Sequence, residues 1–241
     1  PNDKEEIIDL KNKYNFFLME DCCASVGAKF SDGTKIGTVG DVSSFSFYFG
    51  HQLSTIEGGF VNTNSENFHQ IMLMLRSHGW TKDISEEFFN SDIKRWDIDL
   101  ENGPFNFVHN GFNIRSTDLQ AFLGLNQLEK ADIIMKARNR NHLRYQNSIS
   151  DEFIFQDHGN TWPVSLHIGI LARNNTIRSK VLNECKKNGI ETRVWSHGNL
   201  GRHPFWIEKY GVFKGSWANQ IYERGFILPT FPELNENDID K

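Results

Sequence analysis

The chain has 241 residues, 38% of them hydrophobic, and carries a formal net charge of −5 at pH 7. This length provides for one large or two small domains with a sizeable hydrophobic core, and the composition is that of an ordinary globular protein. Because charges of both signs are interspersed and no basic run stands out, the sequence argues against nucleic acid as a partner.

The cysteines and the apolar runs indicate the cellular compartment in which the protein works. Cys22 and Cys23 are adjacent and Cys185 is distant, which makes a poor disulfide framework and matches no metal-ligand spacing. We therefore expect a reducing, cytoplasmic compartment and no metal. No apolar run reaches about 18 residues, so we expect no membrane span. The opening letters "PNDKEEIIDL" lack an initiator methionine and enter a helix at once, which predicts that an N-terminal portion is missing.

The first part of the chain alternates between helical and strand patterns. Residues 2–15 have the apolar spacing of a helix, with Asn2 or Asp3 as its N-cap. A short apolar run then ends in two acids, which is typical of a buried strand. In chain order we expect a helix at 2–15, a strand at 16–21, a turn-rich hairpin at 31–41, strands at 42–49 and 58–64, and a helix at 65–79 capped by Ser65 and closed by Gly79.

The sequence pattern of the second part of the chain predicts further helices and strands. Residues 80–112 read as a long loop, and loops of this length are usually functional or cover another subunit. Residues 116–149 form one long helix or two in sequence, capped by Ser116 or Thr117. A strand at 161–171, a helix at 174–189 and a strand at 190–195 follow. This pattern predicts an α/β chain with one domain at 1–149 and a smaller C-terminal domain at 150–241.

Three polar side chains stand at the predicted strand ends. Asp21 ends a buried strand, where open α/β sheets bind ligands, and its carboxylate would suit a cationic ring nitrogen; the alternative is an N-cap. Ser46 and the turn after Phe49 suit an anion such as phosphate, although a serine in a strand is commonly structural. His51 follows Gly50 and suits proton transfer near neutral pH; the alternative is an ordinary surface or core histidine.

A fourth feature is the segment "HNGFNIRSTD" at 109–118. It presents Asn113 and Arg115 just ahead of a predicted helix, where an arginine can clamp a phosphate or a carboxylate. The alternative is a loop arginine that pairs with a nearby acid. Each of these four signals is weak singly, and their order along the chain makes them specific.

That order closely resembles the sugar aminotransferase family named for DegT, DnrJ, EryC1 and StrS. These are pyridoxal phosphate (PLP) enzymes of fold type I, related to aspartate aminotransferase. The resemblance implies the later part of the family's large-domain mixed sheet, followed by a small α+β C-terminal domain. It is carried by Glu20-Asp21 and then by the blocks "GTVGDVSSFSF", "STIEGGFV", "LRSHGW" and "GFNIRSTDLQAFLGLNQLEK".

The resemblance also implies roles for individual residues. Asp21 matches the acid that pairs with the cofactor's pyridine nitrogen, which keeps the ring able to accept electrons. Ser46 matches the serine that holds the cofactor phosphate. Asn113 matches the asparagine that reaches the cofactor of the neighbouring subunit, with Arg115 in the same block, which implies a homodimer with shared sites. Ala24 stands where the family usually has glutamine, so the contact with the ring hydroxyl departs from the family pattern.

His51 is the second departure, because it stands where the family's aminotransferases carry the lysine that tethers the cofactor. Imidazole forms no lasting bond of that kind, so the cofactor would be held non-covalently as pyridoxamine phosphate (PMP). A subset of the family, the nucleotide-sugar 3-dehydratases, has the same exchange. The resemblance thus implies removal of the C3 hydroxyl from a nucleotide-linked 4-keto-6-deoxy sugar, with His51 as base, L-glutamate as amino donor and a surface glycan such as O-antigen lipopolysaccharide as the pathway.

The remaining expectations concern the C-terminal part and the alternatives. Only Cys185 lies beyond His51, which argues against the iron–sulfur cluster of some relatives. Arg193 would meet the glutamate carboxylate or a sugar phosphate, unless it serves only to pair with an acid. The alternatives to a dehydratase are a sugar aminotransferase of the same family and a degenerate, non-catalytic member.

Overall fold

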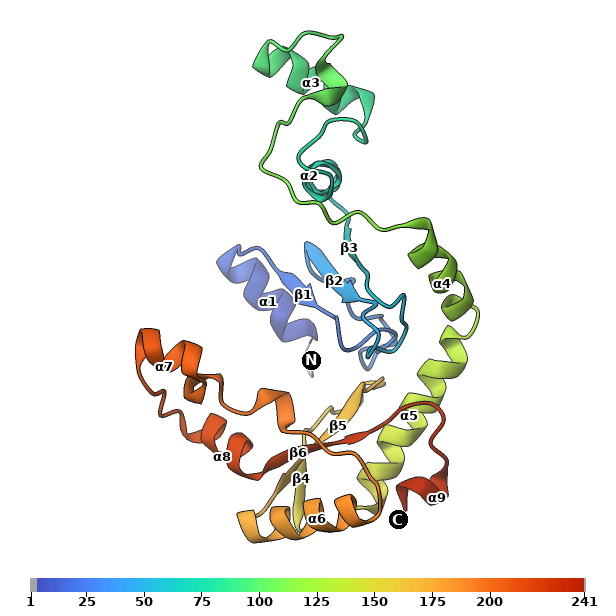
Figure 1. Ribbon diagram of the computed structural model, residues 1–241, viewed down its shortest axis with the longest axis vertical. Helices are drawn as coiled ribbons and strands as arrows, with labels where there is room; N and C mark the ends of the chain where they lie inside the picture. Colours follow the sequence, from blue (N-terminus) through green and yellow to red (C-terminus); the bar gives the residue numbers. More distant parts are fainter. Residues whose placement is uncertain (1–3, 241) are drawn as a thin grey trace. The chain divides into compact units, whose positions relative to one another are not determined.

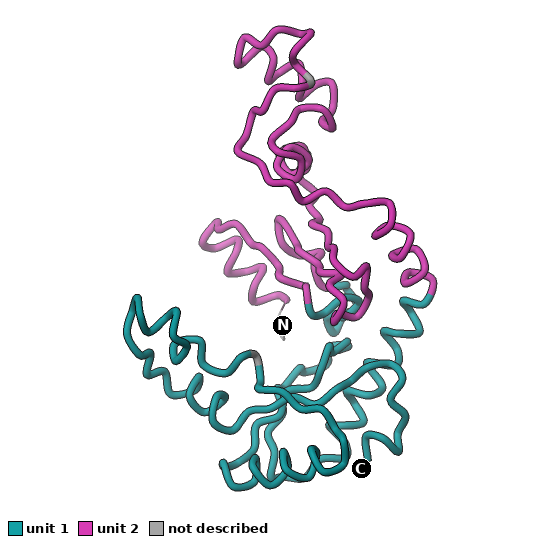
Figure 2. The backbone as a smooth tube through the Cα atoms, in the orientation of Figure 1, with its two compact units in different colours: residues 1–3, 24–35, 130–241 teal, residues 4–23, 36–129 magenta. Residues whose placement is uncertain are grey.

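The computed structural model describes residues 4–240, so the caps expected at Asn2 or Asp3 lie outside the described residues. The chain forms two compact units (Figure 2). Unit 2 comprises residues 4–23 and 36–129, and unit 1 comprises residues 1–3, 24–35 and 130–241.

Unit 2 contains a three-stranded mixed sheet in the order β1-β2-β3 (Figure 1). β1 (Met19–Asp21) runs parallel to β2 (Val42–Ser46), which pairs antiparallel with β3 (Gly59–Thr63). The mixed sheet was predicted, and the three strands lie inside the expected ranges. Ahead of them, α1 (Lys4–Tyr14) is tied to the start of β2 by an ion pair between Lys11 and Asp41.

The helix after β3 follows the sequence prediction. α2 (Glu66–Arg76) begins after Ser65, whose hydroxyl accepts a hydrogen bond from the Phe68 amide at 3.4 Å. Gly79 closes the turn: it has a φ of +91°, and its amide donates to the Met74 carbonyl at 2.8 Å. A glycine suits this left-handed conformation because it has no Cβ to clash.

The prediction of a structureless loop at 80–112 was wrong. This segment contains α3 (Glu86–Trp96) and the short 3₁₀ helix η1 (Gly103–Phe105). A Cβ on Gly103 would lie within 2.7 Å of atoms of Phe89 and Ile93, so the apolar face of α3 packs closely on η1. Acids in the first turn and bases in the last turn of α3 were the sequence signal for a helix.

The long helical pattern that follows is two helices in sequence. α4 (Asp118–Leu128) begins with a capping box in which Thr117 and Gln120 satisfy one another's backbone amides, so Thr117 is the cap. α5 (Ala131–Ser148) follows after two residues. α4 belongs to unit 2 and α5 to unit 1.

Unit 1 is built on an antiparallel sheet in the order β4-β5-β6. Its core is formed by Ile168, Ile170 and Ala172 of β5, Phe226 of β6 and Tyr145 of α5. The elements are β4 (Phe153–Phe155), β5 (His167–Ala172), α6 (Asn175–Lys187), η2 (Trp195–His197), η3 (Leu200–Arg202), α7 (Pro204–Tyr210), α8 (Ser216–Arg224), β6 (Gly225–Pro229) and α9 (Glu236–Ile239).

Two expected elements are corrected. Residues 190–195 form no regular strand, because only Arg193 makes a β-bridge, with Ile227 of β6, before η2 begins. Residues 31–41 hold turns and not a regular hairpin: one antiparallel bridge joins Lys29 to Lys35, and the Glu20 carboxylate accepts the amides of the later part of the loop, as described below.

The compact units group residues across the expected domain boundary. α5 and residues 24–35 belong to the unit that contains 150–241. Backbone hydrogen bonds between Lys29 and Trp162, at 3.1 and 2.9 Å, join the segment 24–35 to that unit. The division into domains at 1–149 and 150–241 stays a prediction.

Candidate active site

The carboxyl ends of β1 and β2 meet at one edge of the unit 2 sheet. The two strands lie side by side in Figure 1. Because they are parallel, their last residues, Asp21 and Ser46, stand at the same edge. Ser44 of β2 pairs with Asp21 in the strand register. The turn after β2 carries His51.

Asp21 is exposed and anionic at this edge. One carboxylate oxygen accepts a hydrogen bond from the Cys23 amide at 3.1 Å. Hydrogen bonds from Cys23 hold the pKa of Asp21 below its ordinary value, and the Ser44 hydroxyl and the charge of His51 lower this pKa further. This contact closes a turn, and no helix begins here, so Asp21 is not a helix N-cap. The carboxylate remains accessible, and its role toward a ligand stays a prediction.

Ser46 begins the turn that carries the histidine. Its hydroxyl oxygen accepts a hydrogen bond from the Tyr48 amide at 3.2 Å, which leaves the hydroxyl proton available for a ligand. The Tyr48 carbonyl in turn accepts from the His51 amide at 2.9 Å. The backbone thus folds back after β2 and returns the imidazole toward the strand end.

The His51 ring is half-buried and oriented by the backbone. Its Nδ1 lies 3.4 Å from the Ser46 carbonyl oxygen, and the ring packs edge-on against Tyr48 at 5.9 Å between centroids. Since a carbonyl only accepts, this contact favours a proton on Nδ1 and leaves a lone pair on Nε2. The effect of His51 on the pKa of Asp21 indicates that the two groups lie within electrostatic range.

Hydrogen bonds from two further side chains stabilise the loops at this edge, and the sequence analysis predicted neither of them. The Glu20 carboxylate accepts the amides of Gly37, Val39 and Gly40 at 2.6–2.7 Å and so fixes the loop before β2. The Gln120 side chain of α4 donates to the Glu57 carbonyl at 2.7 Å and anchors the loop after His51. The acid pair at the end of β1 was the only sequence signal for the first support.

Asn113 and Arg115 form a second cluster within unit 2, which also includes His78 and Trp80. The Arg115 guanidinium donates to the Asn113 side-chain oxygen at 3.3 Å and lies 3.3 Å from His78 Nε2. It also lies over the Trp80 ring at 5.7 Å from the centroid. A backbone bridge between Ser77 and Asn113 holds the segment. Both predicted residues are exposed, and their recorded partners belong to this cluster and not to the strand-end edge.

The last two predicted residues belong to unit 1. Ala24 lies in an exposed turn shortly after β1, and its methyl group offers no hydrogen bond to a ligand. Arg193 is exposed and pairs with Glu191, with Nη2 and Oε1 2.7 Å apart. Pairing with an acid was the alternative to a ligand role that the sequence analysis gave for Arg193. A role for either residue at a ligand remains a prediction.

Two further properties concern metals and membranes. Among residues 4–240, no cluster of three or more histidine, cysteine or acidic side chains has the arrangement of a metal site. Within the same part of the chain, every helix is too short or too polar to cross a lipid bilayer.

Comparison with known proteins identifies the family. Residues 1–241 match the model of the DegT/DnrJ/EryC1/StrS aminotransferase family, so the chain belongs to this family. The GDP-4-keto-6-deoxy-D-mannose 3-dehydratase of Yersinia pseudotuberculosis is 30% identical over 93% of this chain and 61% of its own length. The GDP-perosamine synthase of Escherichia coli O157:H7 is 29% identical over 99% of this chain and 60% of its own length.

A solved structure defines the fold. The E. coli GDP-4-keto-6-deoxy-D-mannose 3-dehydratase, determined with bound hydrated PLP, superposes with a TM-score of 0.83 at 22% identity. The match covers 100% of this chain and 62% of that protein, so the chain spans about three fifths of the relatives that it matches. The fold is thus the α/β fold of the type-I PLP enzymes, as predicted, and the family is one that uses PLP.

Proposed function

We propose that the chain is part of a PMP-dependent 3-dehydratase acting on a nucleotide-linked 4-keto-6-deoxy sugar. The observation that carries the proposal is His51, an imidazole at the strand-end edge in the sequence position where the family's aminotransferases have lysine. The similarity to a sugar 3-dehydratase supports the same reading. The coarser assignment, a sugar-modifying enzyme of the PLP-dependent family, follows from membership of the family.

The residues at the edge fit such a cofactor. Asp21 stays ionised at neutral pH, as the partner of a protonated ring nitrogen must. Ser46 retains a hydroxyl proton to donate to a phosphate oxygen. When bound, the cofactor supplies an electron sink that stabilises negative charge beside its ring.

The proton chemistry falls to His51. The Ser46 carbonyl orients Nδ1, so Nε2 is the atom that accepts a proton and returns it. An imidazole can serve both steps, first as base and then as acid toward a leaving hydroxyl. A lysine here would hold the cofactor covalently, which favours transamination.

A homodimer is part of the proposal. The apolar residues of α4 at helical spacing, Leu119, Phe122, Leu125 and Leu128, are each 62–67% exposed. A stripe of this kind is typical of an interface, and Asn113 and Arg115 lie just before it, exposed and available to a neighbouring subunit. Phe122→Glu should convert a dimer into monomers in analytical ultracentrifugation, whereas Glu129→Gln should leave it intact. A protein that is monomeric before substitution would contradict this part.

A second candidate is a sugar aminotransferase, which the similarity to GDP-perosamine synthase favours. The third is a non-catalytic family member. L-glutamate is the expected amino donor for either enzyme, and the pathway would serve a surface glycan such as lipopolysaccharide.

The test separates these candidates. Full-length protein is incubated with PLP, L-glutamate and GDP- or CDP-linked 4-keto-6-deoxy sugars, and the products are read by mass spectrometry. Replacement of the C3 hydroxyl by hydrogen, a net loss of one oxygen atom from the sugar with 2-oxoglutarate and ammonia formed from L-glutamate, supports the dehydratase. Exchange of the keto oxygen for an amine supports the aminotransferase, and an unchanged sugar supports the non-catalytic reading. Borohydride should fix the cofactor to the protein only in the aminotransferase.

A further inference from the structure

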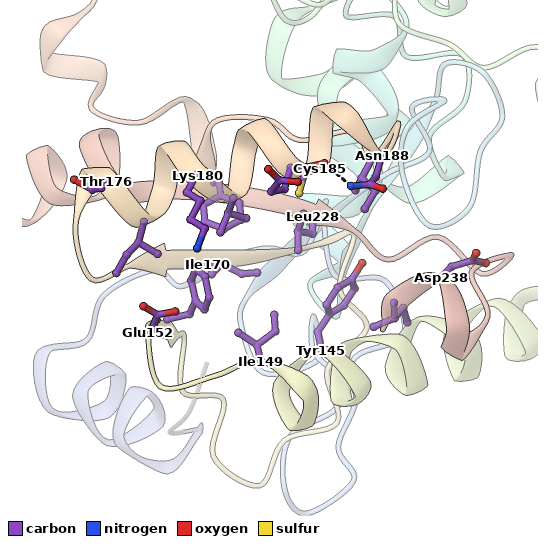
Figure 3. A pocket seen from close by; sticks show the side chains of 17 residues that line it. Tyr145, Ile149, Glu152, Ile170, Thr176, Lys180, Cys185, Asn188, Leu228 and Asp238 are labelled. Atoms are coloured by element: carbon purple, nitrogen blue, oxygen red, sulfur yellow. Dashed lines mark hydrogen bonds between the residues drawn. The ribbon is translucent and has the colours of Figure 1, made fainter. Parts of the chain in front are cut away.

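A partly open cavity of unit 1 is lined by none of the residues to which chemistry is assigned above. It has a volume of about 430 Å³, within the range of small-molecule sites. The cavity lies between α6, the sheet and the end of α5 (Figure 3). Its wall is mostly apolar and includes Ile149, Phe153, Ile170, Ile177, Val181, Phe226 and Leu228.

The floor of the cavity is the packed core of unit 1. Ile170 and Phe226 are each 1% exposed, so the sheet side is rigid and dry. Ile177 and Val181 of α6 face the same core from the other side. An apolar group that entered here would gain contacts that solvent does not provide.

Two side chains of opposite charge lie at the opening of the cavity. Glu152 and Lys180 both line the cavity and are both exposed, and neither forms an ion pair among residues 4–240. In Figure 3 Lys180 reaches down from α6 while Glu152 lies on the opposite side of the opening. Glu184, by contrast, is paired with Lys187 at 2.6 Å. The third lining acid, Asp238, accepts a hydrogen bond from the Asn235 amide at 3.3 Å at the start of α9, so among the described lining residues Lys180 and Glu152 are the charges best placed to meet a ligand.

A neutral polar group lies deeper. Tyr145 is 6% exposed, and burial raises the pKa of its phenol to about 12, so the hydroxyl keeps its proton. No side chain of the described residues is hydrogen-bonded to this hydroxyl, which points into the cavity in Figure 3. A distal polar atom of a ligand would find a partner there.

We propose that this cavity binds a free α-amino acid with a large apolar or aromatic side chain. Lys180 meets the carboxylate, Glu152 meets the α-ammonium group, and the side chain lies against the partly buried Ile149, Phe153 and Val181. Because Lys180 and Glu152 have opposite charges and neither forms an ion pair among the described residues, they favour a zwitterion over a simple acid or amine. The site belongs to unit 1 and is independent of the dehydratase assignment.

The experiment is isothermal titration of the full chain with L-phenylalanine. We expect saturable binding with a dissociation constant on the order of 0.1–1 mM. Two analogues, 3-phenylpropionate without the ammonium and phenethylamine without the carboxylate, should each bind about threefold to tenfold more weakly. Lys180→Met and Glu152→Gln should weaken binding of L-phenylalanine by the same factor.

Matched variants locate the site. Lys186→Met changes an exposed lysine of the same helix outside this cavity, and it should leave the affinity within about twofold. Val181→Trp should abolish binding by filling the cavity, whereas Ser179→Trp on the exposed face of α6 should not. If Val181→Trp fails to fold, the two charge variants still decide the question.

Several outcomes would overturn the inference. These are the absence of saturable binding up to about 10 mM, equal affinity for the two analogues and L-phenylalanine, and unchanged affinity in both charge variants. Retained binding in a folded Val181→Trp protein would place the amino acid elsewhere.

Discussion

The strand-end edge of unit 2 and the cavity of unit 1 are built in opposite ways. At the edge, Asp21, Ser46 and His51 are polar groups fixed by backbone amides and carbonyls. In the cavity, apolar side chains make up most of the wall, with Lys180 and Glu152 at the opening and the Tyr145 hydroxyl deeper. Proton transfer requires oriented polar groups at hydrogen-bond distance, whereas an enclosed apolar volume provides affinity.

Among the substitutions that test this contrast, His51→Lys should have the largest effect on activity. A lysine should hold the cofactor covalently and lower dehydration by about 10³-fold or more, because the proton carrier is lost. Absorbance spectra, borohydride trapping and product mass measure the effect. His69→Lys, on the exposed face of α2, is the control. Normal dehydration by His51→Lys would refute the role of the histidine, and binding of L-phenylalanine in unit 1 should not change.

Asp21→Ala should have the second largest effect. Loss of the anion beneath the ring should weaken PLP binding by about 10- to 100-fold and stop the chemistry, because the ring nitrogen loses its charged partner. Fluorescence titration with PLP gives a binding readout that is separate from turnover. Asp9→Asn, an exposed acid of α1, should bind PLP normally. Unchanged PLP affinity in Asp21→Ala would remove the ring-nitrogen role.

Glu20→Gln tests the support of the edge and not its chemistry. The carboxylate accepts three backbone amides, and an amide side chain cannot replace all three bonds. We expect a loss of about 2–3 kcal/mol in the free energy of unfolding. Urea denaturation measures it, with Glu5→Gln of α1 as the surface control. Equal stability of the two variants would show that the loop at 36–40 holds its shape without Glu20.

The smallest effect concerns a buried histidine of unit 1. Burial, with a contribution from His158, lowers the pKa of His142 from 6.5 to about 4. Because the folded value is below the unfolded value, stability should be complete above pH 6.5 and decline as the pH falls toward 4.

Thermal unfolding across this pH range measures the slope. His142→Gln should flatten it, whereas His203→Gln, whose ring lies at the surface, should not. A slope that is identical in the wild type and His142→Gln would show that another group controls the acid sensitivity.

Local sequence rules predicted much of the fold. Ser65 and Thr117 cap the helices where expected, and Gly79 ends α2, because caps depend only on neighbouring residues. The strands β1, β2 and β3 also followed from local patterns. The failures were α3, η1 and residues 190–195. The acids and bases at the ends of α3 were a local signal that the sequence analysis did not use, whereas residues 190–195 have a strand-like composition that tertiary packing overrides.

The sequence by itself determined the family, the mixed sheet and the identity of the residues at the strand ends, because these depend on residue order and local periodicity. Only the tertiary structure decided that Asp21, Ser46 and His51 share one edge, that Asn113 and Arg115 form a separate exposed cluster, and that a cavity lies beneath α6. The reason is physical. Parallel pairing of β1 with β2 and the packing of α6 on its sheet join residues far apart in the chain, and no local pattern encodes those distances.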